Sequence, residues 1–144
     1  MTILADFEAE HREIENAVSL FLALLAEAVP PDTHRLMSAR WRLTFLISRH
    51  VSVEDTHLYP IIAADMRVEV TDIIDRFTGQ IGIFRQKFRA WQAKWDAEHM
   101  AADWAGFRRD TFVLFGDLNE RIHEEEALLF PLIEEAERKL AAKA

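Results

Sequence analysis

The chain has 144 residues, half of them apolar, and its formal net charge is −8. This length suits one domain with one core, so we predict a single domain spanning residues 1–144. The acidic charge argues against nucleic acid and membrane as partners, and the absence of cysteine excludes disulfides and cysteine metal sites. No stretch has the length of a membrane span or the pattern of a signal peptide, so we expect a cytoplasmic protein.

Four segments carry the apolar spacing of an amphipathic helix. They run from about Ile3 to Ala28, Asp32 to Ala64, Val70 to Ala97 and Ala102 to Ala142. The first segment ends at a pair of prolines, which cannot continue a helix. No segment alternates apolar and polar residues as a strand does, and the connections are short. We therefore predict an all-α, up-down-up-down four-helix bundle.

The second and fourth segments contain similar stretches. HVSVEDTHLYP, from His50 to Pro60, aligns with RIHEEEALLFP, from Arg121 to Pro131. Both stretches place a glutamate at the fifth position and end in leucine, an aromatic residue and proline. The prolines predict a kink or stop near the end of each stretch. The first positions differ, because one stretch begins with histidine and the other with arginine.

On the second segment, His50 and Glu54 are four residues apart, which places them about 40° from each other around a helix. By the same geometry His57 lies within about 20° of His50. The stripe that carries these residues is otherwise apolar, so their side chains face the interior. A buried carboxylate needs a cation, a hydrogen-bond network or a proton. Taken alone, the spacing favours a simple pair between His50 and Glu54.

On the fourth segment, Arg121 and Glu125 lie on or beside the apolar stripe, and His123 points outward. We expect Arg121 and Glu125 to form an ion pair one helical turn apart. On the first segment, His11 faces inward between apolar neighbours. A lone inward histidine is usually a core residue, so His11 becomes a candidate ligand only together with the other inward polar groups.

With these features the chain resembles the hemerythrin family, including its bacterial HHE cation-binding branch. The resemblance implies a four-helix bundle that holds two irons, bridged by two carboxylates and bound mainly by histidines. It implies oxygen binding, iron or oxygen sensing, or handling of reactive species as the function. Carried over by position, it implies that His11, His50, Glu54 and Glu125 serve one iron, with the two glutamates as bridges.

The chain departs from the family pattern at the second iron, which would take two histidines from the third helix and one from the fourth. The third helix has no histidine, and Gln80 stands near the expected position. Arg121 stands at the expected position on the fourth helix. We therefore expect a degenerate site with at most one divalent metal ion, iron first and zinc or manganese otherwise. His57 is either an extra ligand or a packed histidine, and Arg121 is a cation that replaces the lost metal, held by Glu125 and Glu54.

Two other interpretations stay open. In one, the bundle binds no metal, Arg121 replaces the lost iron, and the protein is an interaction or regulatory module. In the other, Glu54 with His57 and Glu120 with His123 form the two ExxH motifs of a ferritin-like di-iron carboxylate protein, although the outward direction of His123 opposes this. No nucleophilic triad or phosphate loop is recognisable, so no reaction and no catalytic residue are assigned. Iron at the site could take a small diatomic ligand.

The chain has four tryptophans, and two of them, Trp91 and Trp95, are one turn apart near the end of the third segment. Such a pair forms part of the core at one end of a bundle. Alternatively, it forms a Trp-rich face for a homodimer or a protein partner.

Overall fold

The computed structural model describes residues 3–27, 29–64 and 67–143, and within these ranges the chain is helical and has no strand. The elements are α1 Ile3–Leu25, α2 Thr33–Val53, η1 Glu54–Leu58, α3 Tyr59–Ala63, α4 Val68–Lys94, α5 Ala97–Ala102, α6 Trp104–Glu124, η2 Glu125–Leu129 and α7 Phe130–Lys143. The elements η1 and η2 are single π-helical turns. The end predicted for the first segment, Ala28, lies outside the described residues.

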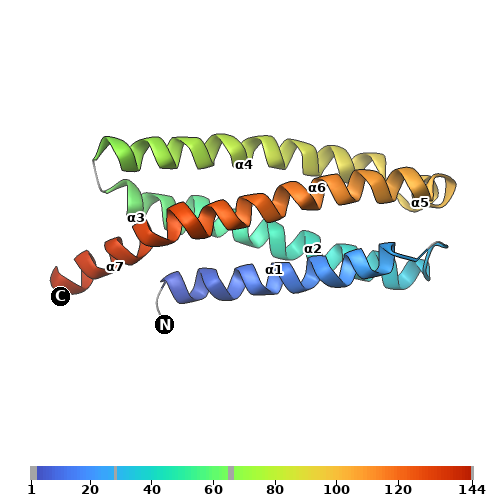
Figure 1. Ribbon diagram of the computed structural model, residues 1–144, viewed down its shortest axis with the longest axis horizontal. Helices are drawn as coiled ribbons and strands as arrows, with labels where there is room; N and C mark the ends of the chain where they lie inside the picture. Colours follow the sequence, from blue (N-terminus) through green and yellow to red (C-terminus); the bar gives the residue numbers. More distant parts are fainter. Residues whose placement is uncertain (1–2, 28, 65–66, 144) are drawn as a thin grey trace.

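The chain folds as a bundle of four long helical rods (Figure 1). Two rods are composite, because α2 continues through η1 into α3, and α6 continues through η2 into α7. The other two rods are α1, which packs against α2 and α6, and α4, which packs against α6. The prediction of an all-α bundle is confirmed. No described helix combines the length and the apolar character needed to cross a bilayer.

The short helix α5 was not predicted. It fills the connection between α4 and α6, where the fourth segment was expected to begin. Asp96 caps its N-terminus, because one carboxylate oxygen accepts a hydrogen bond of 2.8 Å from the His99 backbone N–H. A helix this short does not repeat its apolar pattern, so periodicity could not reveal it.

The two π turns explain how helices continue past Pro60 and Pro131. In η1 the N–H of Tyr59 bonds to the carbonyl of Glu54, and in η2 the N–H of Phe130 bonds to the carbonyl of Glu125. Each bond spans five residues instead of four, so the turn before the proline ring is wider. A wider turn relieves the crowding that a proline causes in a regular helix. The prolines therefore mark a widened turn, and the helix does not stop there.

The interior contains two apolar clusters with a polar layer between them. The larger cluster lies toward α5 and includes Phe21, Phe107 and Phe115, and the smaller lies toward α3 and α7 and includes Phe77, Leu58 and Leu129. The change from one apolar cluster to the other occurs at the same level along the bundle axis on several helices. It falls at His11 between Phe7 and Ile14, at His50 and Glu54 between Ile47 and Leu58, and at Glu125 between Ile122 and Leu129. The candidate ligands therefore interrupt the core at one level of the bundle.

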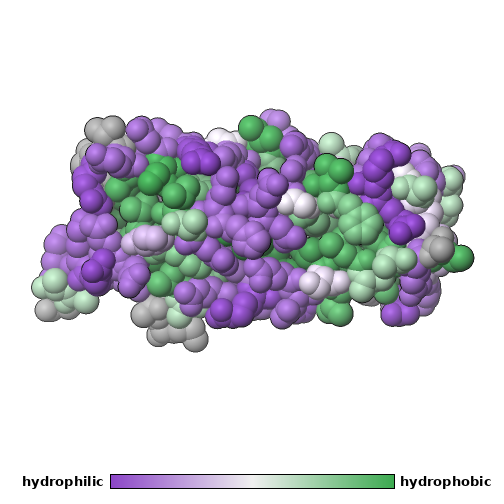
Figure 2. All heavy atoms as spheres, in the orientation of Figure 1, coloured by the Kyte–Doolittle hydropathy of each residue, from purple (hydrophilic) through white to green (hydrophobic). Residues whose placement is uncertain are grey.

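The surface shows the same division into a polar middle and apolar ends. Figure 2 shows hydrophilic side chains over the middle of the face that α6 crosses, with hydrophobic ones gathered toward both ends.

The tryptophans differ in their burial. Trp91 and Trp95 are buried, so this pair belongs to the core. The indole N–H of Trp91 donates to the Thr111 hydroxyl at 2.9 Å. Trp41, in contrast, is 70% exposed.

Candidate metal centre

Four buried polar side chains meet in the layer between the two apolar clusters. His11 comes from α1, His50 from α2, Glu54 from η1 and Glu125 from η2. One ligand atom from each residue lies within 4.8 Å of the others. In the described part of the chain, no other group of three or more such residues is found. Both glutamates open a π turn, so each helix widens directly after its buried carboxylate.

Each of the two histidines directs its Nε2 atom toward the carboxylates. His11 Nε2 lies 2.7 Å from Glu125 Oε2, and His50 Nε2 lies 3.3 Å from the same oxygen. His50 Nε2 also lies 2.8 Å from Glu54 Oε1. Two nitrogen and two carboxylate donors therefore face one small volume.

A second carboxylate lies behind each histidine. His11 Nδ1 is 3.2 Å from Glu126 Oε1, and His50 Nδ1 is 3.1 Å from Glu10 Oε2. Histidines that bind metals usually donate their other ring N–H to a carboxylate or carbonyl, which fixes the tautomer and the ring orientation. Glu10 and Glu126 were not among the predicted residues, because both lie off the apolar stripes. Their positions directly beside His11 and Glu125 in the sequence were the available signal.

Burial and the contacts within the cluster shift three pKa values. Burial, with repulsion from Glu125, raises the pKa of Glu54 to about 8. Burial also acts against the charge of Glu125, but hydrogen bonds with His11 and His50 outweigh it and hold the Glu125 pKa below its ordinary range. Burial disfavours a charged His50, yet its contacts with Glu10, Glu125 and Glu54 hold its pKa well above the ordinary value. Without metal, both shifts favour a protonated Glu54 and a charged His50.

The cluster is suited to a divalent cation, both because of the types of its donor atoms and because it contains buried oxygens without hydrogen-bond partners. Both carboxylate oxygens of Glu54 are buried without a hydrogen-bond partner among the described residues, and Oε1 makes an ion-pair contact of 2.8 Å with His50 Nε2. Without metal, a proton on Glu54 limits the cost of burying this group, and a divalent cation can take the place of that proton. Imidazole nitrogen with carboxylate oxygen suits Fe(II), Zn(II) or Mn(II).

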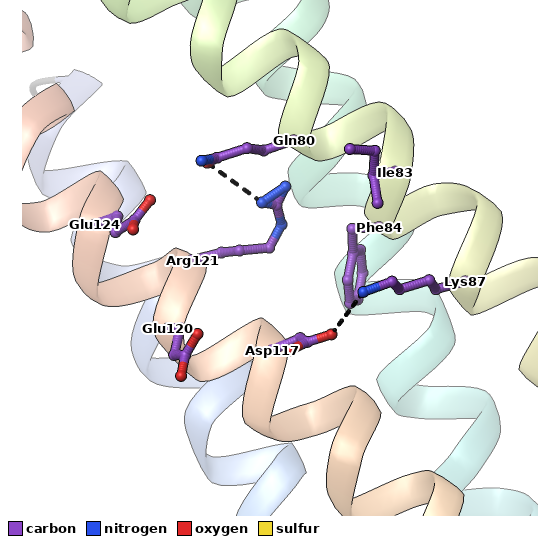
Figure 3. A pocket seen from close by; sticks show the side chains of 8 residues that line it. All are labelled: Gln80, Ile83, Phe84, Lys87, Asp117, Glu120, Arg121 and Glu124. Carbon is purple, nitrogen blue, oxygen red and sulfur yellow. Dashed lines mark hydrogen bonds and ion pairs between the residues drawn. The ribbon is translucent and has the colours of Figure 1, made fainter.

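Arg121 lies beside the cluster and makes a different contact from the one predicted. Its Nη1 donates to Gln80 Oε1 on α4 at 3.5 Å, and its Cζ lies 5.8 Å from the centre of the Phe84 ring (Figure 3). The predicted ion pair with Glu125 is wrong, because no ion pair joins these two described residues and Glu125 turns instead toward the histidines. Burial lowers the pKa of Arg121, and the charges of Glu125 and Glu54 oppose that shift from a longer range.

The remaining predicted residues stay outside the cluster. His57 is exposed and borders a surface pocket between α1 and α2 that Arg49 also lines. The prediction used a constant rotation per residue, but the π turn η1 changes that rotation before His57 is reached. Glu120 and His123 are exposed as well. The arrangement of a ferritin-like di-iron site, which needs these side chains in the interior, is therefore not formed.

A four-helix bundle with a buried cluster of two histidines and two glutamates defines a class of helical cation-binding proteins. The sequence profile of the Hemerythrin HHE cation binding domain matches residues 2–133. The chain therefore belongs to the hemerythrin HHE cation-binding family. Comparisons with curated proteins and with solved structures gave no match.

Proposed function

We propose that the protein binds one divalent cation in the polar layer and acts as a cation-binding or sensing protein. His11, His50, Glu54 and Glu125 would hold the ion, with Glu10 and Glu126 orienting the imidazoles. The observation that carries the proposal is the buried Glu54 carboxylate, whose oxygens lack hydrogen-bond partners among the described residues. The bound ion would act as a Lewis acid, and iron would add redox chemistry and affinity for a small diatomic ligand.

The restriction to one ion rests on Arg121 and Gln80. Family resemblance places ligands of a second iron at these positions, but neither side chain offers an imidazole. The two side chains instead share a hydrogen bond between α4 and α6. The guanidinium is half-buried and charged, so it repels a second cation on its side of the cluster.

Among divalent ions we propose iron first, followed by zinc and manganese. The mixed donor set accepts all three, so the donors alone give no strong preference. The family membership supports iron. Metal availability and coordination geometry would decide between them in the cell.

A metal-free module is the second candidate, and the protonation of the cluster supports it. A charged His50 compensates the Glu125 carboxylate, and a protonated Glu54 removes the second negative charge. Arg121 contributes further positive charge from outside the cluster. In this state the layer needs no ion for charge balance, and the function would lie in protein interaction or regulation.

Metal analysis distinguishes the two candidates. Protein made without a histidine tag is loaded anaerobically with Fe(II), Zn(II) or Mn(II), passed over a desalting column and analysed by elemental mass spectrometry. We expect one ion per chain for at least one metal, and loss of that ion in His50→Ala. His123→Ala is the matched control, because it removes an exposed histidine. Less than about a tenth of an ion per chain for all three metals would reject metal binding.

A further inference from the structure

The helix α2 is basic although the protein as a whole is acidic. Between Thr33 and Val53 the sequence has four arginines and no aspartate or glutamate, whereas the whole chain carries a net charge of −8. Arg40 is buried, and Arg35, Arg42 and Arg49 are exposed. Glu10 and Glu13 of α1 approach Arg49, so Arg35 and Arg42 give the outer side of α2 its positive charge.

The same side of α2 exposes large apolar side chains. Trp41 is 70% exposed and Phe45 is 51% exposed, and both belong to a stripe that begins at Met37. The rings of Trp41 and Phe45 are stacked, with centroids 5.9 Å apart and planes 8° from parallel. Two adjoining exposed aromatic rings on a small protein are a mark of an interaction site.

A groove between α2 and α4 adjoins this stack. It encloses about 280 Å³ over a floor that includes Ile47, Phe84 and Phe88, and Arg85 and Arg89 line it from α4. Among the described side chains that line the groove, none carries a carboxylate. Ser48 borders the groove and follows Phe45 by three residues, so the stack and the groove share one side of α2. We name the stack and the groove, together with the exposed side chains of Arg42 and Arg89, the α2–α4 face.

We propose that the α2–α4 face docks an acidic amphipathic helix of a partner protein. An apolar stripe on such a helix would cover Trp41 and Phe45 and place a side chain in the groove, as in other helix-in-groove complexes. Its carboxylates would meet Arg42 and Arg89, which supplies charge complementarity and steers the encounter. The proposal does not depend on metal binding, because the face lies outside the His/Glu cluster.

Charge favours a peptide over an anionic membrane as the occupant. A flat membrane faces much of the molecular surface and is repelled by the net charge of −8. A docked helix experiences mainly the charges within a Debye length, about 8 Å at physiological salt. The concave groove also suits an inserted side chain better than a planar surface.

The test uses the full chain and a synthetic, fluorescein-labelled helical peptide of about four turns, with leucine and phenylalanine along one stripe and glutamate elsewhere. Fluorescence anisotropy should show saturable, salt-sensitive binding. The double variant Trp41→Ala, Phe45→Ala should weaken it about tenfold or more. Arg42→Gln with Arg89→Gln should weaken it and reduce its salt dependence. Phe112→Ala, which truncates a 44% exposed aromatic side chain on α6, should leave binding unchanged.

Four results would overturn the proposal. The first two are the absence of saturable peptide binding and equal binding of a peptide that has glutamine in place of glutamate. The third is a loss of peptide affinity in Phe112→Ala equal to that in the Trp41/Phe45 variant. The fourth is a parent protein that is a dimer in solution and a Trp41/Phe45 variant that is a monomer. Vesicles with about 30% phosphatidylserine provide the membrane arm, and binding to these vesicles without binding to the peptide would assign the face to lipid instead. Circular dichroism of every variant separates loss of binding from loss of fold.

Discussion

Glu10 determines which nitrogen of His50 faces the cluster, because its carboxylate lies 3.1 Å from Nδ1. Replacing it by glutamine keeps the shape of the side chain but weakens the polarisation of the ring. We therefore expect Glu10→Gln to lower metal affinity by about 10- to 100-fold. Competition with a chromophoric zinc chelator measures the change.

Glu13→Gln is the matched control for this variant. Glu13 and Glu10 both approach Arg49, at 3.7 and 3.8 Å, but only Glu10 contacts His50. An equal loss of affinity in the two variants would show that the Arg49 contact, and not the orientation of His50, is responsible.

Glu54 should make the metal-free protein less stable at alkaline pH. Its pKa is raised from 4.5 to about 8, and the pKa of His50 is raised above 6.5, so the folded state binds more protons than the unfolded state. The free energy of unfolding must then fall as pH rises through this range. The lowered pKa of Glu125 acts in the opposite direction, and only at acid pH. Urea denaturation between about pH 5 and 9 measures the slope.

Glu54→Gln should flatten this pH dependence, because glutamine does not titrate. Glu120→Gln, at an exposed position, should keep the full slope. If Glu54→Gln and the parent protein lose stability in parallel as pH rises, Glu54 is not the titrating group.

Arg121 and Gln80 can be converted to the residue type that the family places there. A double change, Gln80→His with Arg121→His, removes the guanidinium and supplies an imidazole from α4 and another from α6. We expect the bound metal to rise above one ion per chain, whereas Gln80→His alone keeps the repelling charge and should not exceed one. Elemental analysis measures both, and a double variant that stays at one ion would contradict a vacated second site.

Helical periodicity predicts that His11, His50, Glu54 and Glu125 face the interior, whereas their grouping into one site was implied only by the family resemblance. The partner of Arg121 could not be predicted this way. Its long side chain reaches both Gln80 and the vicinity of the carboxylates, and three-dimensional packing decides between them. Glu10 and Glu126 were missed for a related reason, since a residue beside a stripe gives no periodic signal.

At the scale of elements, Arg40 ties α2 to the end of α4. Its guanidinium donates to the backbone carbonyls of Trp95 and Gln92, and its Cζ lies 4.5 Å from the centre of the Trp91 ring. Carbonyls in the last turn of a helix lack partners within that helix and carry a partial negative charge. We expect Arg40→Met to lower the free energy of unfolding by about 2–4 kcal/mol, measured by urea denaturation.

Arg42→Met controls for the charge and for the change in helix propensity. Arg42 lies on the same helix but is exposed. Its replacement should change the free energy of unfolding by no more than about 0.5 kcal/mol. Similar losses in both variants would show that the carbonyl contacts of Arg40 contribute little.

The four rods were predictable because their apolar residues repeat with the period of an α-helix over many turns. The π turns were not predictable from that period, since each changes the rotation per residue within a single turn. This one irregularity accounts for the misplacement of His57, which follows the opening residue of η1 by three positions. The matching prolines at Pro60 and Pro131 were the sequence signal for the turns, although a proline by itself predicts only a kink or stop.

At the scale of the whole molecule, a ligand that binds only the folded chain raises its thermal stability. At a metal concentration of about 100 times Kd the gain is about 2.7 kcal/mol. For a chain of this size that gain corresponds to a rise in Tm of roughly 5–10 °C. Scanning calorimetry with and without Zn(II) should show the rise, and EDTA should reverse it.

The same experiment on two variants assigns the effect to the cluster. His50→Ala should abolish the rise, and His123→Ala should retain it, because only the first residue lies in the cluster. A rise that persists in His50→Ala would show that zinc binds elsewhere on the folded chain.

The division of the core into two apolar clusters would also govern how quickly a metal ion can reach the His/Glu cluster from solvent. The apolar cluster next to α3 and α7 is the smaller of the two, so that end of the bundle separates at the lower free-energy cost. Because the His/Glu layer forms its boundary, such a partial separation exposes the layer to solvent while the other end stays packed. An ion held in this layer would then exchange without global unfolding, and truncating side chains in the smaller cluster would change how fast an ion enters and leaves more than how tightly it is held.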